Sequence, residues 1–297
     1  MHRNRTPKWP ATLATITLLT MGADGCSKSR ADDFSRFKQT ASLQSKGSAP
    51  RAQLRYRPVA GEDVAYQLVV SRECPALKLR AKMRLRVALK VDTVSGGGGS
   101  IVLRLIALQR LDPPPAGGLP ELGPAYVLLQ GRLGPRGRLT EIQDSDKLPS
   151  PVNLALALPL LLPHLPDPAV GIGAQWRTSG KQGWKRGQAA DSLTNQPGFH
   201  GSTEVLLHST YKLTAREDGK RPVIQGEHKF QLRSHTRTLS HVTHHRGHGK
   251  ATARYVVNPA DGLPVHAQVT LKGTYKLRAN DKTLPIKETI TLTFKRD

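Results

Sequence analysis

The chain of 297 residues has few cysteines and few aromatic residues, and it has no long apolar run. It contains only two cysteines, so at most one disulfide can form and no spaced cysteine pairs are present to hold a metal ion. Aromatic residues make up 5% of the chain, which is few for a protein that stacks nucleic-acid bases. No apolar run reaches the roughly 18 residues that a spanning helix requires, which excludes a multi-pass membrane protein.

Acidic residues are also scarce. The chain has 22 Asp and Glu against 45 Lys and Arg, a formal net charge of +23. Such an excess predicts salt-sensitive association with polyanions. An ordinary basic surface that is only solvated, without such a partner, would give the same excess. Since there is no recognised nucleic-acid reading module and few aromatic residues accompany the cations, we expect no nucleic-acid partner.

Motifs that carry catalysis are missing. The sequence has no His-Glu-x-x-His, no Gly-x-Ser-x-Gly, no phosphate loop and no dinucleotide fingerprint. We therefore predict no enzyme, no catalytic residue and no cofactor. One cluster of five histidines could bind a divalent metal or sense mild acid, or simply belong to a polar strand and loop. Its members are His235, His241, His244, His245 and His248.

The N-terminus has the pattern of a secretory signal. Arg3, Arg5 and Lys8 lie within the first ten residues without an acid, and residues 11–23 form a short, mostly apolar, uncharged stretch. This order of a basic and then an apolar region predicts an exported protein, with residues 1–25 as the signal peptide.

The end of this segment, Ala23-Asp24-Gly25-Cys26, resembles the lipobox of bacterial lipoproteins. The resemblance implies cleavage after Gly25 and a lipid attached to Cys26, although Ala23 replaces the usual leucine and Asp24 is atypical. Ser27 follows the cysteine, which by the same resemblance implies an outer-membrane protein that faces the periplasm. Residues 26–53 are then expected to be a flexible, lipidated tether. In the alternative, an ordinary signal is cleaved elsewhere or Cys26 pairs with Cys74.

The clearest secondary-structure signal spans residues 77–91. Its odd-numbered residues are apolar and its even-numbered residues are almost all Lys or Arg. This period of two predicts a long strand with one apolar and one cationic face. A strand buried on both faces would be apolar throughout, so the segment belongs to a one-sided sheet.

Other segments predict further hairpins. Turn residues such as Gly, Pro, Asn and Asp separate candidate strands at 101–110, 125–133, 138–142, 205–215, 223–233, 251–257, 264–278 and 286–295. We therefore expect a mainly β fold with a minor α part. It would be a large curved antiparallel sheet, or open half-barrel, of about ten strands in a single domain at 54–297.

One short helix is expected between the two groups of strands. Ser150 is placed as its N-cap and Pro151 as its first residue, while Pro159 should end it. The apolar residues of this region either plug the concave side of the sheet or form the lip of a pocket. The candidate lip residues are Leu154, Leu156, Leu158, Leu160, Leu161, Leu162 and Leu165.

The cationic face of the 77–91 strand is a candidate anion-binding surface. A solvated sheet face has the same pattern, whereas a surface facing anionic lipid or lipopolysaccharide is the functional alternative. The candidate anion contacts are Lys78, Arg80, Lys82, Arg84, Arg86 and Lys90.

Residues beyond the signal resemble uncharacterised secreted bacterial domains and lipoproteins. The shared positions are Leu54, Tyr56, Gly61, Tyr66 and Leu68, followed by Leu165, Pro166, Val170, Gly173 and Trp176. A long curved sheet with a helix on its concave face is also similar to the half-barrel of bacterial lipoprotein carriers. That second likeness concerns the fold and carries no function by itself.

Two functions follow as hypotheses. In the first, a lipid-anchored, non-enzymatic protein binds an apolar ligand, such as a lipid or a lipoprotein acyl chain, inside the curved sheet. In the second, a structural or adhesion lipoprotein binds anionic envelope polymers through a cationic sheet face. The first requires a large apolar cavity, and the second requires binding that weakens steeply with salt.

Overall fold

The computed structural model describes residues 40–95, 98–112, 126–144, 160–186, 200–237, 242–279 and 282–297. The predicted signal peptide, Cys26 and the expected helix at 150–158 lie outside these residues. Among the described residues, no helix is long and apolar enough to cross a bilayer.

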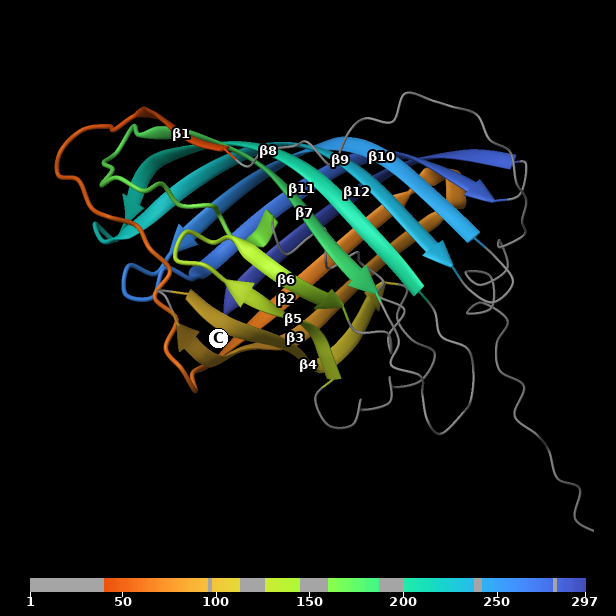
Figure 1. The fold of residues 1–297 in the computed structure, drawn as a ribbon, viewed down its shortest axis with the longest axis horizontal. Coiled ribbons are helices and arrows are strands. Elements are labelled where there is room, and N and C mark those ends of the chain that lie inside the picture. Colours follow the sequence, from red (N-terminus) through yellow and green to blue (C-terminus); the bar gives the residue numbers. More distant parts are fainter. Residues whose placement is uncertain are drawn as a thin grey trace, which may run out of the picture.

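Twelve strands form one sheet (Figure 1). They are β1 (Thr40–Ser45), β2 (Asp63–Cys74), β3 (Leu79–Ser95), β4 (Gly98–Asp112), β5 (Tyr126–Leu133), β6 (Leu139–Asp144), β7 (Gln175–Arg186), β8 (His200–Glu217), β9 (Arg221–Arg237), β10 (Val242–Val257), β11 (Pro264–Ala279) and β12 (Lys282–Arg296). Their order is β1-β7-β6-β5-β4-β3-β2-β12-β11-β10-β9-β8, with a further pairing between β7 and β8. The prediction of a mainly β fold built on one large, curved antiparallel sheet is confirmed.

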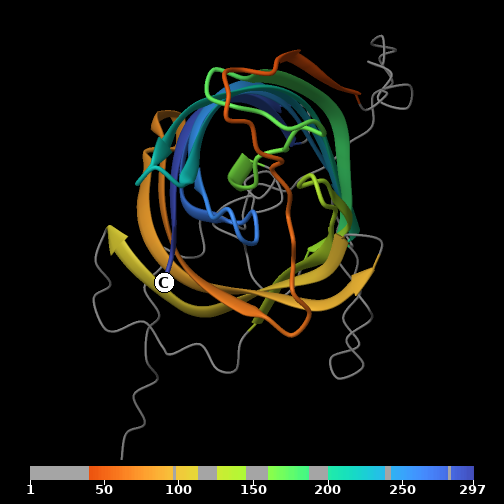
Figure 2. The ribbon, with the colours of Figure 1, turned by 90° about the vertical axis from the view of Figure 1, so that its left-hand side faces the viewer.

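The sheet curls around its own apolar face (Figure 2). Strands β7 and β8 are paired over twelve positions, which brings the two ends of the sheet together. Strands β6 and β7 run parallel and are joined by the single pair Gln143 and Lys185. The curled sheet therefore stays open along most of this seam.

Strand β3 shows how the sequence pattern sets the two faces. Its odd-numbered residues from Met83 to Val91 are each at most 8% exposed and belong to the core. The start of the strand differs from the prediction, because Leu77 lies in a short 3₁₀ turn, Pro75–Leu77, that links β2 to β3. Pro75 suits the first position of such a turn, since its missing N–H has no partner there in any case.

The N-terminal boundary of the domain also differs from the prediction. Residues 40–45 were expected to be part of a flexible tether, but they form β1, which pairs with Gln175–Ser179 of β7. Ala52 forms a further bridge with Val170. Because the edge of β7 offers backbone partners, this polar segment is ordered without a strong apolar pattern, and the domain begins by Thr40.

One end of the curled sheet is filled from inside. The segment around Leu160 to Leu165 and the turn 258–263 both enter the interior (Figure 2). Tyr56 donates a hydrogen bond to the Pro163 carbonyl at 2.8 Å, and Tyr255 donates one to the Leu160 carbonyl at 2.6 Å. The aromatic hydroxyls thus satisfy the carbonyls of a chain that crosses the core outside regular structure.

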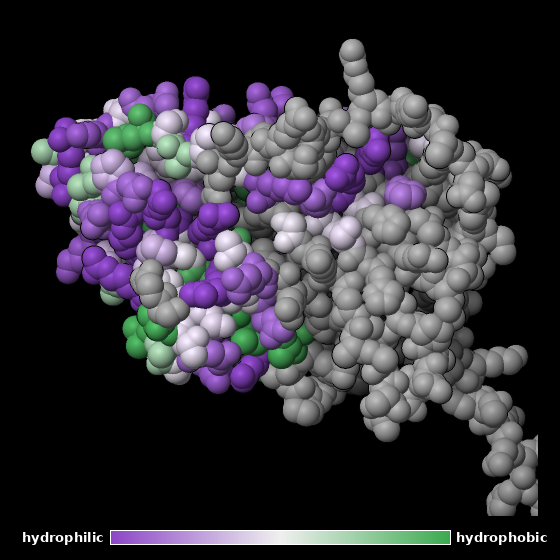
Figure 3. All heavy atoms as spheres, viewed as in Figure 1, coloured by the Kyte–Doolittle hydropathy of each residue, from purple (hydrophilic) through white to green (hydrophobic). Residues whose placement is uncertain are grey.

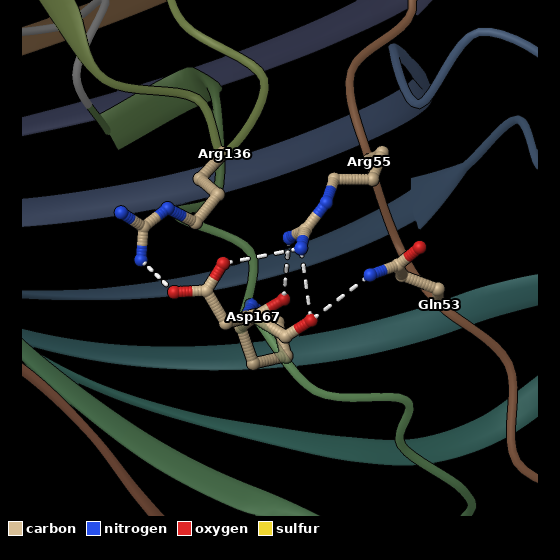
Figure 4. A network of polar contacts seen from close by, with 5 residues as sticks. Gln53, Arg55, Arg136 and Asp167 are labelled. Carbon is tan, nitrogen blue, oxygen red and sulfur yellow. Dashed lines mark hydrogen bonds and ion pairs between the residues drawn. The ribbon is translucent and has the colours of Figure 1, made fainter.

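A network of polar contacts joins chain segments at this filled end (Figure 4). The Asp167 carboxylate contacts both Arg55, at 3.1 Å, and Arg136. Arg55 also donates to the Pro166 carbonyl, and Gln53 donates to the Asp167 carbonyl. Three segments that are distant in sequence are therefore tied together at the surface of the same end.

Candidate functional site

The predicted cations of β3 point outward, and most of them have a partner. Arg80 lies 3.7 Å from Glu73, Arg86 lies 3.2 Å from Asp297, and Lys90 lies 3.1 Å from Asp92. These pairs reduce the net positive charge that the β3 face offers to an anion.

The remaining predicted anion contacts are less tightly held. Arg84 is exposed and reaches Gln109 at 3.5 Å, and Lys82 is exposed. Lys78 does not lie on a strand, because it ends the 3₁₀ turn with a positive φ of 48°. The candidate anion contacts are thus spread over a turn and one strand.

A second cationic feature lies on the outer face of β9, β10 and β11. Lys229 pairs directly with Lys250 across β9 and β10, and Lys250 pairs directly with Lys272 across β10 and β11. All three side chains are exposed. We call these three residues the lysine row. Neighbouring strands lie about 4.8 Å apart, so the row spans roughly 10 Å.

Like charges directly opposite each other in a sheet are destabilising. In the part of the chain that the structure describes, no salt bridge joins Lys229, Lys250 or Lys272 to a carboxylate. Glu227 precedes Lys229 by two residues on the same face, without an ion pair to it, and Glu204 is already bound by Lys181 and Arg233. Within the described residues, no ion pair therefore compensates the lysine row.

Polar side chains surround the lysine row. Glu227, Thr252 and Thr270 lie next to it on one side, and Gln231, His248 and Thr274 lie on the other. The described part of the surface in the view of Figure 1 is likewise mainly hydrophilic (Figure 3). With no aromatic side chain in these positions, the face is suited to anionic groups and hydrogen-bonding groups rather than to stacked bases.

Sequence reasoning missed the lysine row because it depends on strand register. Lys229, Lys250 and Lys272 are separated by about twenty residues each, and none belongs to a dense basic run. The signal that could have found them is the hairpin itself. Once Arg237 is paired with Val242 and the turn at 258–263 is placed, the pairing of the flanking strands follows.

The predicted lip residues fall into two groups. Leu154, Leu156 and Leu158 lie outside the described residues. Leu160, Leu161, Leu162 and Leu165 are each at most 5% exposed and belong to the core cluster. The described leucines thus fill the interior, and Leu162 also contributes to the wall of a pocket.

This pocket lies at the seam between β6 and β7 and has a volume of about 210 Å³. We call it the seam pocket. Its apolar wall includes Leu139, Leu162 and Leu207, and its polar wall includes His164 and Tyr211. It occurs on the edge of β7 that faces away from β8, between Ser179, where the pairing with β1 ends, and Lys185, where β6 reaches β7.

His164 is held tightly beside the seam pocket. Its backbone N–H donates to the Tyr211 hydroxyl at 3.3 Å, and its carbonyl accepts from the Trp176 indole at 2.7 Å. Burial and then the nearby Arg136 charge lower the pKa of His164 to about 4. Its imidazole is therefore neutral at physiological pH.

A second buried histidine joins a serine and a tyrosine. His228 Nδ1 lies 2.8 Å from Ser209 Oγ, and its Nε2 lies 3.2 Å from the Tyr255 hydroxyl. Burial lowers the pKa of His228 to about 4. Ser209 is 3% exposed, so this serine and histidine form an internal hydrogen-bond network without access for a substrate.

The histidine cluster is only partly described. His244 and His248 are exposed on β10, and the backbone of His244 pairs with that of His235. His241 lies outside the described residues. Among the residues described, no group of three or more His, Cys, Asp or Glu is placed to hold a metal ion. Cys74 is a buried free thiol.

No protein-family model matches the chain, and a search of curated proteins finds no match either. The site must therefore be interpreted from its own geometry, in which the exposed lysine row and the seam pocket are the two main features.

Proposed function

We propose that the protein is a non-enzymatic, lipid-anchored protein of the cell envelope that binds anionic polymers through the outer face of its sheet. The observation that carries this proposal is the lysine row, in which three exposed cations face one another without an acidic partner in the described part of the chain. A repulsion of this kind is relieved when phosphate or carboxylate groups bind between the ammonium groups.

The anchor belongs to the same proposal. The lipobox-like segment that ends in Cys26 supports export and acylation, and Ser27 supports an outer-membrane position facing the periplasm. A lipidated protein held at a membrane is confined near envelope polymers, so even modest affinity for them suffices.

Removing the lysine row tests the proposal. We expect the triple substitution Lys229→Thr, Lys250→Thr and Lys272→Thr to weaken binding to immobilised lipopolysaccharide by a factor of roughly 150, since each cation near an anionic surface contributes about 1 kcal/mol. Threonine keeps strand propensity and already occupies neighbouring positions. The measurement is a binding isotherm at two salt concentrations.

The matched control removes the same charge from β3, through Lys82→Thr, Arg84→Thr and Arg86→Thr. If the lysine row contacts the polymer directly, the affinity of this control should fall only a few-fold, because the lost charge weakens only the long-range attraction. Equal losses in both variants would show that affinity follows net charge alone. A larger loss in the control would place the contact on β3, and absence of binding by the unmodified protein would refute the proposal.

The seam pocket supports a second candidate function, the binding of an apolar ligand such as a lipid acyl chain. Its wall contains Leu139, Leu162 and Leu207 and lies beside the core. The volume of about 210 Å³ is below that of usual ligand pockets, so it suits the end of one chain rather than a whole lipid.

Filling the seam pocket tests this second function. If an apolar ligand binds there, mass spectrometry of organic extracts should find a copurified lipid with the unmodified protein and several-fold less with Leu207→Trp, because the indole occupies the space. The lysine-row triple variant serves as the control and should retain the lipid. Extracts without a lipid, or equal lipid in both proteins, would end this candidate.

A further inference from the structure

Two histidines flank the lysine row on the outer face. His208 of β8 pairs directly with Lys229 of β9. His248 of β10 precedes Lys250 by two residues, so it lies on the same face of the same strand. Both side chains are exposed.

The surroundings of His248 contain cations and neutral groups. Arg246 and Lys250 are its neighbours on β10. On β9 it faces Gln231, with Lys229 and Arg233 on either side, and on β11 it faces Thr274, with Lys272 and Lys276 on either side. None of these neighbours is a carboxylate.

The surroundings of His208 are similar. On β9 it faces Lys229, with Glu227 and Gln231 on either side, so Glu227 is the single acid among its described cross-strand neighbours. On β7 it faces Ser179, between Arg177 and Lys181, and the Ser179 hydroxyl lies 2.8 Å from its Nδ1. Its neighbours on β8 are Leu206 and Thr210.

We infer that mild acid strengthens the binding of anionic polymers at the lysine row, because His208 and His248 add positive charge to it. Imidazole is the side chain that ordinarily changes charge between about pH 5 and pH 8. In the free protein this charge is opposed by the neighbouring cations, whereas in the complex it faces the bound anion. Proton binding and anion binding therefore favour each other. The inference rests on the proposed function, since it concerns the same surface.

Other described histidines do not explain such an effect. Burial lowers the pKa of His164 and His228 to about 4, and burial followed by the Arg254 charge lowers the pKa of His266. His164 and His228 therefore remain uncharged as the pH falls to about 5. His244 is exposed on β10, two residues from Arg246 and farther from the lysine row than His248.

The experiment measures binding of dextran sulfate by the full-length protein at about pH 8 and about pH 5.5. Sulfate esters keep their charge over this range, so a change in affinity reports the protein. We expect binding to be up to roughly thirtyfold tighter at the lower pH, since two charges are added near the anion. In the double variant His208→Gln and His248→Gln, this difference between the two pH values should fall below about twofold.

Matched variants separate the possible failures. His266→Gln, on the same outer face, should keep the pH difference of the unmodified protein. The lysine-row triple variant should lose affinity at both pH values. If it kept its affinity, the proposed function itself would be refuted. A double variant that keeps the full pH difference, while binding still depends on the lysine row, would overturn the inference alone. Loss of the difference in His244→Gln instead would also overturn the assignment to His208 and His248.

Discussion

Replacing Trp176 with alanine is expected to lower the free energy of unfolding by about 4 kcal/mol, the range for a fully buried tryptophan. Trp176 is 2% exposed, and its ring stacks on Tyr211 with ring centroids 5.5 Å apart. The substitution would leave a large cavity at the filled end of the sheet. It would also remove the donor to the half-buried His164 carbonyl.

Urea denaturation measures this loss. Trp176→Phe keeps most of the apolar surface and loses the donor, so it should cost only about 1 to 2 kcal/mol. An alanine variant within about 1 kcal/mol of the unmodified protein would contradict the packing of Trp176 against the chain segment at His164.

Lowering the pH from about 7.5 to about 5 is expected to remove about 4 kcal/mol of stability. The pKa of His164 and that of His228 both lie near 4 in the folded protein, whereas an exposed histidine titrates near 6.5. Below about pH 6.5 the unfolded chain therefore binds more protons than the folded one, and stability falls as the pH decreases toward 4. At pH 5 each histidine contributes about 2 kcal/mol to the loss.

Urea unfolding at the two pH values checks this expectation. Most carboxylates are still ionised at about pH 5, so the histidines dominate the difference. His228→Gln should roughly halve the pH dependence, although its stability at the higher pH also falls through altered bonds to Ser209 and Tyr255. Equal stability at both pH values would contradict the burial of the two imidazoles.

The sequence predicted the sheet well where one face of a strand is apolar. In β3 the alternation was strong enough to assign both faces, and the odd-numbered residues from Met83 to Val91 are buried. Turn residues also located most hairpins, although several strands extend farther than their apolar pattern. β10, for example, begins at Val242 rather than at 251, because backbone pairing continues through its histidines and glycines.

Strands with little side-chain pattern were not predicted. β7 places Trp176, Thr178 and Gly180 on alternate positions, so only the first is a large apolar residue. β1 contains Leu43 among polar residues and is ordered by its pairing with β7. The seam pocket is lined by residues of β7, β6 and β8 and depends on the position of β7 relative to β6. The pocket could therefore not be predicted from the sequence and was found only in the three-dimensional structure.

The position of β12 has a consequence for how the chain is completed. This last strand lies between β2, the second strand, and β11, and the backbone of the terminal residue Asp297 donates to the Ala65 carbonyl. During synthesis β2 must wait for β12, which follows it by most of the described chain, before that junction can form. Since closing so long a loop is slow, the sheet should remain incomplete until β12 has been made and has found β2.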